Sequence, residues 1–247
     1  MRLNKFISQT GLCSRREADT WIEKGRVLVN GRRPQLGQQV GPEDEVKVNG
    51  RVLGARRKKH VTIAFNKPAG IVCTTDRNAS DNIIDFIKHP VRVFPIGRLD
   101  KDSEGLILLT SDGDIVNEVL RAENNNEKEY IVSVDKVTTE KFLSGMAAGV
   151  RLTDLHEMTQ PCRISALGDR TFRIILTQGL NRQIRRMCEM FGYEVKSLKR
   201  VRIMNIQIGS LRSGHWRDLQ DWELRGLTAE RAPLPATADD AAEPPPE

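Results

Sequence analysis

The stretch that decides the fold is Phe94-Pro95-Ile96-Gly97-Arg98-Leu99-Asp100-Lys101-Asp102-Ser103-Glu104-Gly105-Leu106-Ile107-Leu108-Leu109-Thr110. Its second half is a continuous apolar run, which predicts a buried strand. Asp100 precedes this run and is flanked by arginine and lysine, and a carboxylate beside cations stays ionised at neutral pH. Held at the rigid edge of a sheet, Asp100 is a candidate nucleophile or general base. The same residues also suit an ordinary turn that Gly105 ends, so both interpretations stay open at this point.

The composition restricts the class of protein. The chain has 247 residues, 38% hydrophobic and 29% charged, which suits one large or two smaller domains. No apolar run approaches the roughly 20 residues of a membrane span, and the N-terminus lacks the apolar segment of a secretory signal. We therefore expect a cytoplasmic protein. Its cysteines and histidines are scattered without metal-ligand spacing, which predicts reduced thiols and no metal site.

The positive charge is concentrated in the N-terminal part of the chain. Residues 1–60 hold 14 lysines and arginines against 6 acidic residues, whereas residues 221–247 hold 2 against 7. A small basic unit attached to a nearly neutral body indicates a module that binds a polyanion.

The secondary structure of the basic unit can be predicted from its sequence. Leu3, Phe6 and Ile7 suggest a short helix, and Ser14-Arg15-Arg16-Glu17 is a capping box that starts a second helix. This helix carries Ala18, Trp21 and Ile22 on one face and ends near Gly25. Two Asn-Gly pairs, at 30–31 and 49–50, then predict two small hairpins.

This pattern resembles the small RNA-binding domain named after ribosomal protein S4. The resemblance covers nearly all of residues 1–48 and implies that the exposed cations of this unit contact RNA. Residues 49–60 would form a basic linker to the next domain. The cations expected to contact RNA are Arg2, Lys5, Arg15, Arg16 and Arg26.

The rest of the chain predicts an α+β domain over residues 61–227 with a mixed, largely antiparallel sheet and flanking helices, because clustered strands alternate irregularly with helices. Residues 228–247 are low in complexity, and we expect a disordered tail. Strands are expected from Val61 up to Pro68 and at 71–75, 91–96, 106–110, 130–134, 162–164, 171–176 and 203–208. Helices are expected at 82–88, 114–121, 139–149, 181–191 and 221–227.

Two further stretches carry candidate functional residues. In the segment 178–191, Asn181 suits a helix N-cap, and an apolar stripe that includes Ile184 at helical spacing indicates core packing. Arginines in the first turns of that helix oppose its dipole and need an anionic partner. In the segment 127–134, Tyr130 opens a strand, where a tyrosine packs half-buried or offers its ring to a nucleobase.

Taken together, these motifs resemble those of the RNA pseudouridine synthases, in particular the RsuA-type branch. The motifs occur in the family order. They are Asn66-Lys67-Pro68-Ala69-Gly70, Gly97-Arg98-Leu99-Asp100 with Gly105–Thr110, Lys128-Glu129-Tyr130, and Gly179-Leu180-Asn181-Arg182-Gln183-Ile184-Arg185-Arg186-Met187. The resemblance spans about residues 2–225 and implies an isomerase of RNA uridines that needs neither cofactor nor metal.

The resemblance also implies roles for single residues. It puts the nucleophile at Asp100, its arginine partner at Arg185 and the base-stacking tyrosine at Tyr130. Leu198 would pack on the other face of the base, and Arg98 would hold the base flipped out of the helix. Ile184 is also expected to contact the substrate. Plausible phosphate contacts are Lys67, Arg182, Lys196, Lys199, Arg200 and Arg202, although a solvated surface charge is the more common role for any single one of them.

Two other classes of protein are weighed against this one. A non-catalytic RNA-binding factor of ribosome assembly could share the fold, although Asp100, Arg185 and Tyr130 argue against it. A metal-dependent nuclease would need clustered carboxylates, and on a strand Asp100 and Asp102 would face opposite sides. We expect a monomer that acts on large-subunit ribosomal RNA, with a tRNA anticodon uridine as a second target.

Overall fold

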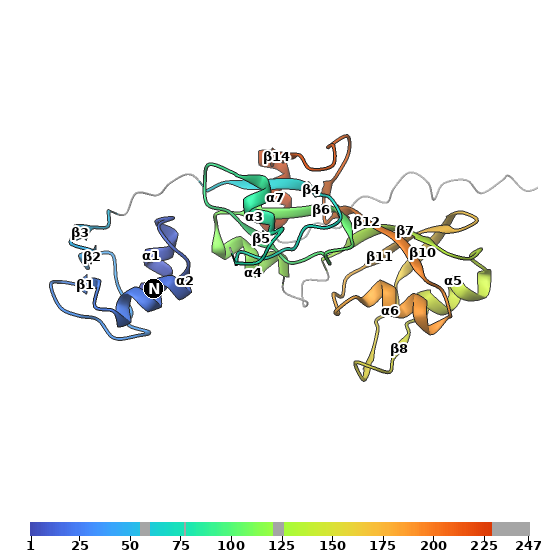
Figure 1. Ribbon diagram of the computed structural model, residues 1–247, viewed down its shortest axis with the longest axis horizontal. Coiled ribbons are helices and arrows are strands. Elements are labelled where there is room, and N and C mark those ends of the chain that lie inside the picture. Colours follow the sequence, from blue (N-terminus) through green and yellow to red (C-terminus); the bar gives the residue numbers. More distant parts are fainter. Residues whose placement is uncertain (55–59, 77, 121–125, 229–247) are drawn as a thin grey trace, which may run out of the picture.

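The computed structural model describes residues 1–54, 60–76, 78–120 and 126–228. Most of the expected tail and the centre of the expected linker lie outside these residues. The N-terminal unit lies at one end of an elongated molecule, drawn in blue in Figure 1. It contains α1 (Leu3–Gln9), α2 (Arg15–Glu23) and an antiparallel sheet of β1 (Val27–Val29), β2 (Val46–Val48) and β3 (Arg51–Val52).

The local signals of this unit are confirmed with one exception. The Ser14 side chain accepts from the Glu17 backbone, and the Glu17 side chain accepts from the Ser14 backbone, so the capping box is complete. The Asn49-Gly50 turn joins β2 to β3. The first expected hairpin is wrong, because β1 makes only a single bridge to Arg32 and pairs with β2 instead. Pairing with β2 puts Val27 and Val29 into a small core with Leu3 and Ile7.

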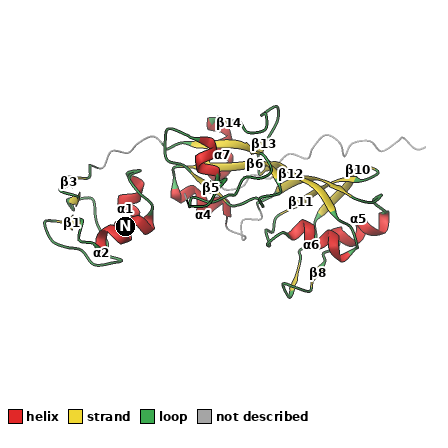
Figure 2. Cartoon of the chain, viewed as in Figure 1, coloured by secondary structure: helices red, strands yellow, loops and turns green. Residues whose placement is uncertain are grey.

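The main domain is built on a nine-stranded sheet with the order β10-β11-β7-β12-β6-β4-β14 (Figure 2). In addition, β13 pairs with β12 and β5 pairs with β6, and among the described strand pairs of this sheet only β12–β6 is parallel. The sheet is therefore mixed and largely antiparallel, as expected. Its strands are β4 (Thr62–Lys67), β5 (Phe94–Ile96), β6 (Glu104–Thr110), β7 (Lys128–Val134), β10 (Arg163–Gly168), β11 (Thr171–Leu176), β12 (Val195–Ile203), β13 (Ile206–Gln207) and β14 (Trp216–Asp218). A separate pair is formed by β8 (Arg151–Leu152) and β9 (Glu157–Met158).

Helices cover this sheet in two groups, which Figure 1 shows toward its two ends. The first group comprises α3 (Ile83–Ile87), α4 (Gly113–Leu120) and α7 (Asp221–Thr228), and the second comprises α5 (Glu140–Ala147) and α6 (Gln183–Met190). In the first group α3 packs on one face of β6, against Ile107 and Leu109, while α4 and α7 belong to the core that contains Leu106 and Leu108. Burial on both faces explains the continuous apolar run of β6.

Two expected strands differ from the structure. Residues 71–75 make only one isolated bridge, at Val72, because the Val72 backbone bonds to Asp81 and Ile83 at the start of α3 and not to a strand. The longest strand, β12, was missed over most of its length. Its cations break the apolar alternation that marks a strand, yet they lie at the centre of the sheet.

Candidate active site

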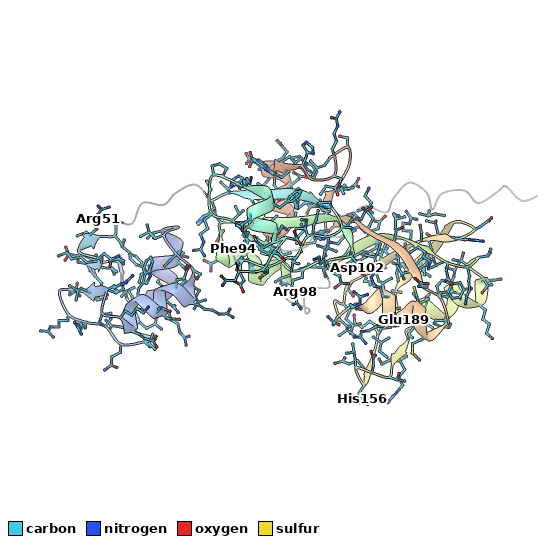
Figure 3. The ribbon with its side chains drawn as sticks, in the orientation of Figure 1. Arg51, Phe94, Arg98, Asp102, His156 and Glu189 are labelled. Carbon is cyan, nitrogen blue, oxygen red and sulfur yellow. The ribbon has the colours of Figure 1, made fainter. Side chains whose placement is uncertain are left out.

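A cavity of about 750 Å³ is lined by residues of the paired strands β7 and β12, of α6 and of the loops around them. The loop 97–103 forms one wall and the loop 177–182 another, with side chains of β7, β12 and α6 between them. Figure 3 shows Arg98 and Asp102 in the middle of the molecule. The cavity brings together most residues that the sequence singled out, namely Arg98, Asp100, Tyr130, Arg182, Ile184, Arg185 and Leu198.

Asp100 lies in a tight turn directly before β6 and is half-buried. The Ser103 N–H donates to the Asp100 carbonyl at 3.1 Å, and the Leu99 N–H donates to the Cys73 sulfur at 3.4 Å. Behind the turn, the Gly70 N–H donates to the Lys101 carbonyl at 2.7 Å. These contacts hold the Asp100 carboxylate at the cavity wall on a rigid loop, which is what a positioned nucleophile requires.

Lys67 lies behind the same loop. It was expected to contact a phosphate, but its position differs from that expectation. Its side chain is fully buried and does not line the cavity. The ammonium donates to the carbonyls of Pro68 at 2.9 Å, Ile71 at 2.8 Å and Lys101 at 3.4 Å. All three N–H donors are used within the protein, so Lys67 holds the loop in place and cannot reach RNA.

The arginine partners also differ from the expectation. Arg182 binds Asp102 through two hydrogen bonds, at 3.2 and 3.3 Å, and reaches the Asp100 carboxylate at 3.9 Å. The buried Arg185 pairs with Asp102 at 3.4 Å and donates to the Ser103 hydroxyl at 3.2 Å. Arg185 was expected against Asp100, but the turn presents Asp102 to it instead.

Asp100 and Asp102 therefore do not face opposite sides. Both precede β6, so strand alternation does not apply to them, and one guanidinium, that of Arg182, contacts both carboxylates. Partial burial raises the pKa of Asp102, but the Arg182 hydrogen bonds and the charges of Arg185 and Arg182 outweigh it and lower that pKa. Within the described residues, no three side chains of His, Cys, Asp or Glu form a group that could hold a metal ion.

The start of α6 is unusual. Arg182, not Asn181, is the N-cap residue. Its φ of 50° is in the left-handed region, which is strained for residues other than Gly, Asn and Asp. The Gln183 side chain accepts from the Leu180 backbone, and the Asn181 side chain accepts from Arg186. This arrangement aims Arg182 back at the turn that carries Asp100.

Between the two loops, the cavity is lined by one aromatic ring and by apolar side chains that include Leu198 and Ile184. Tyr130 is half-buried on β7, directly opposite Arg200 of β12 and Ile174 of β11. Leu198 and Ile184 are 6% and 4% exposed and belong to one apolar core. A planar base entering the cavity would therefore meet one π-face and apolar contacts, which suits stacking.

Three residues of the cavity were missed or misassigned. Arg200, expected at a phosphate, is 4% exposed and donates to the carbonyls of Leu106 and Arg98. Lys128 and Cys73 also line the cavity. For Lys128 a signal existed, because residues two apart on a strand share a face and Tyr130 is two residues away. Outside the cavity, Arg202 pairs with Glu127 and Glu129 and is not free for a phosphate.

The basic residues of the N-terminal unit are at its surface. Arg2, Arg15, Arg16 and Arg26 are exposed, which leaves them accessible to a polyanion. Lys5 differs, because its ammonium lies 2.5 Å from the Asp114 carboxylate of α4.

Comparison with known proteins identifies the class. Residues 61–190 match the family model of the RNA pseudouridylate synthases, and residues 1–46 match that of the S4 domain. A solved structure described as a pseudouridylate synthase superposes with a TM-score of 0.68 at 29% identity, covering 92% of this chain and 99% of that chain. The chain belongs to the RNA pseudouridine synthase family and isomerises uridine to pseudouridine in RNA.

Among individual relatives, the chain is 57% identical over 228 residues to the dual-specificity RNA pseudouridine synthase RluF of Escherichia coli, covering 92% of this chain and 78% of that protein. It is 33% identical to the ribosomal large subunit pseudouridine synthase B of Bacillus subtilis, covering 92% and 96%. These similarities confirm an enzyme of the RsuA type, with an S4 domain ahead of an α+β catalytic domain. Along the described part of the chain, no helix has the length and apolarity to cross a membrane.

Proposed function

We propose that Asp100 is the nucleophile of this isomerisation and that Tyr130 and Leu198 sandwich the target uracil. The observation that carries the proposal is the single cavity, in which the Asp100 turn faces Tyr130, Leu198 and Ile184. A uracil stacked within an RNA helix exposes neither C1′ nor its ring edge to a protein carboxylate, so the nucleotide is extruded first. Stacking on Tyr130 contributes roughly 1–3 kcal/mol toward that cost.

The chemistry needs one bond broken and one formed at the same sugar carbon. The N1–C1′ bond breaks, the uracil turns, and a C5–C1′ bond forms while C5 loses its hydrogen as a proton and N1 gains one. Asp100 assists by attacking either C1′ or the uracil ring, and the geometry is compatible with both. Enclosure in the cavity keeps the detached base from diffusing away.

We assign supporting roles to the arginines. Arg185 holds the Asp100 turn through Asp102 and Ser103, and the exposed Arg182 is placed to exchange the carboxylates for an RNA phosphate. Arg98, at the rim of the cavity, would hold the flipped nucleotide. The exposed cations of residues 1–48, as an S4 domain, would grip the surrounding RNA.

For the substrate, we propose large-subunit (23S) ribosomal RNA with a tRNA anticodon uridine as a second target. The names of the two relatives, one of dual specificity and one of the ribosomal large subunit, support this choice. We place the enzyme in the cytoplasm with these RNAs, acting on free or pre-ribosomal RNA. We also expect a monomer, which sedimentation at micromolar concentration checks and a dimer peak would contradict.

The test is pseudouridine mapping of ribosomal RNA and tRNA from cells that lack the protein, complemented with wild type or Asp100→Asn. We expect a site that is lost in the deletion, restored by wild type and not restored by Asp100→Asn. Restoration by Asp100→Asn would reject the nucleophile. Loss confined to one class of RNA would reject the dual substrate.

A further inference from the structure

Lys128 is a half-buried cation on the wall of the active-site cavity that the reaction scheme above does not use. Its ammonium donates to the carbonyl of Asn126 at 3.1 Å and to that of Thr177 at 3.3 Å. A lysine has three N–H donors, and these two bonds leave the third for a ligand in the cavity. Lys128 shares its strand face with Tyr130, two residues on, so this donor lies beside the ring that stacks on the base.

Arg200 is a second cation on the same wall, in register with Tyr130 on the neighbouring strand. It donates through Nε to the Leu106 carbonyl at 2.7 Å and through Nη1 to the Arg98 carbonyl at 3.5 Å, while its buried Nη2 has no hydrogen-bond partner among the described residues. Its guanidinium carbon lies 6.0 Å from the centre of the Tyr130 ring. These contacts hold the charge in a fixed place next to the stacking position.

The two cations are close enough to repel each other. Burial lowers the pKa of Lys128, and the charge of Arg200 lowers it further. The neighbouring carboxylates of Glu127 and Glu129 are taken by Arg202. In the part of the chain that the structure describes, neither Lys128 nor Arg200 forms an ion pair with a carboxylate. A half-buried cation beside a buried one, with no counter-ion, is costly unless an anion arrives during function.

The reaction produces such an anion inside the cavity. If Asp100 attacks C1′, the electron pair of the broken N1–C1′ bond stays on the uracil, and its charge spreads onto the carbonyl oxygens. If Asp100 adds to the ring, the negative charge again falls on a ring carbonyl oxygen. Both routes therefore place negative charge on an oxygen of the base, whose face is held by Tyr130.

We propose that Lys128 is a catalytic residue that donates its free N–H to a carbonyl oxygen of the flipped uracil, and that Arg200 is the positioning residue beside it. Together they stabilise the negative charge that the base carries between detachment and reattachment, as preorganised donors do at an oxyanion. The proposal rests on the proposed base-binding cavity, and it holds for either point of attack by Asp100. After the C5–C1′ bond forms, C5 loses its hydrogen as a proton and N1 gains one, so the ring is neutral again and the product is released.

The test compares Lys128→Met, Lys128→Gln and Lys128→Arg with the wild type and with Lys141→Met, which removes an exposed lysine of α5. The substrate is RNA from cells that lack the protein, labelled with tritium at uridine C5, because such RNA contains the target whichever uridine it is. Single-turnover tritium release, RNA dissociation constants and melting temperatures are measured. The glutamine variant keeps donors for the Asn126 and Thr177 carbonyls but lacks the charge.

We expect Lys128→Met and Lys128→Gln to slow tritium release by about 100-fold, with RNA affinity and the melting temperature of the glutamine variant close to wild type. Lys128→Arg keeps the charge and should retain more activity than either. Because the neutral amine is the weaker donor, the wild-type rate should fall at a lower alkaline pH than that of Lys128→Arg. Arg200 on β12 and Tyr130, which lies on β7 with Lys128, are other ionisable groups of this wall, and the cavity is also lined by Cys73, Arg98, Asp100, Lys101, Arg182 and Arg185.

A glutamine variant with the wild-type rate would overturn the proposal, and so would a loss that is wholly explained by weaker RNA binding. The proposal would also be overturned if the rates of wild type and Lys128→Arg fell at the same alkaline pH. An Asp100→Asn protein that still releases tritium would instead reject the proposed nucleophile and leave the Lys128 comparison valid.

Discussion

At the scale of single residues, burial separates cations that look alike in the sequence. Lys67 is fully buried with three carbonyl partners, Lys128 is half-buried with two, and Arg15 is exposed. The first has no donor left for a ligand, the second has one, and the third is accessible to RNA. We therefore expect the number of free donors, and not the charge itself, to decide which of them contacts substrate.

Lys67→Met tests the structural role of the most buried of these cations. The substitution leaves the Pro68, Ile71 and Lys101 carbonyls without their donor, and we expect the free energy of unfolding to fall by about 2–4 kcal/mol. Urea denaturation measures this change, with Lys141→Met as the exposed control. A variant of normal stability but weakened RNA binding would return Lys67 to the role of phosphate contact.

At the scale of elements, the parallel pairing of β6 and β12 depends on Gly105. Its φ is +105°, and a Cβ placed on it would lie 2.3 Å from the carbonyl oxygen of Arg200. Gly105 therefore does not end the turn after Asp100. It lies within β6, where it lets β12 approach and brings Arg200 under the catalytic turn.

Gly105→Ala should accordingly be among the most damaging small substitutions. Because the clash is with backbone on a central strand, we expect a loss of more than about 3 kcal/mol in the free energy of unfolding, or no folded protein at all. Gly168→Ala in β10 is the control, since a Cβ there meets nothing within 4 Å. Equal melting temperatures for the two variants would contradict this account.

The packing of α7 beside β14 depends on an ion pair between the two elements. The buried Glu223 accepts two hydrogen bonds of 2.7 Å from Arg217 and one of 2.9 Å from the Gln220 backbone. The Arg217 bonds lower the pKa of Glu223 and, with the Gln220 bond, outweigh the effect of burial. A lowered folded-state pKa stabilises the protein above the unfolded-state value, near 4.5, and this stability is lost as the pH falls through the folded-state pKa.

Glu223→Gln should therefore cost about 1–3 kcal/mol of unfolding free energy at pH 7, and the difference from wild type should shrink below about pH 4. Denaturation curves measured between pH 7 and pH 3 test this, with Glu189→Gln at an exposed position of α6 as the control. A difference that stays constant across this range would exclude the ionised pair as its source.

At the scale of the whole molecule, the basic N-terminal unit and the catalytic cavity are separate sources of RNA binding. The unit has its own core, formed by α1, α2 and the β1–β3 sheet. We expect its exposed arginines to contact RNA with a strength that depends on salt, and we expect the cavity to hold a single nucleotide by stacking.

Removal of residues 1–48 should therefore weaken RNA binding and flatten its salt dependence while leaving the catalytic domain folded. In the full chain, Arg15→Gln together with Arg16→Gln should lower the slope of log affinity against log salt by about 1.5, as two lost phosphate contacts predict. Filter binding at several salt concentrations gives the slope, and melting curves report on folding. An unchanged slope in both proteins would show that this unit does not contact phosphates.

The sequence by itself determined the fold class, the family and the stretches around the active site, because these depend on local patterns. The apolar run of β6, the capping box of α2 and the ordered motifs around Asp100, Tyr130 and Arg185 are all visible along the chain. Only the tertiary structure decided which hydrogen-bond and ion-pair partners these side chains have, since the partners depend on which backbone segments pack together. It brought β12 to the centre of the sheet, buried Lys67 and Arg200, turned Arg185 toward Asp102, and left Lys128 with one free donor beside Tyr130.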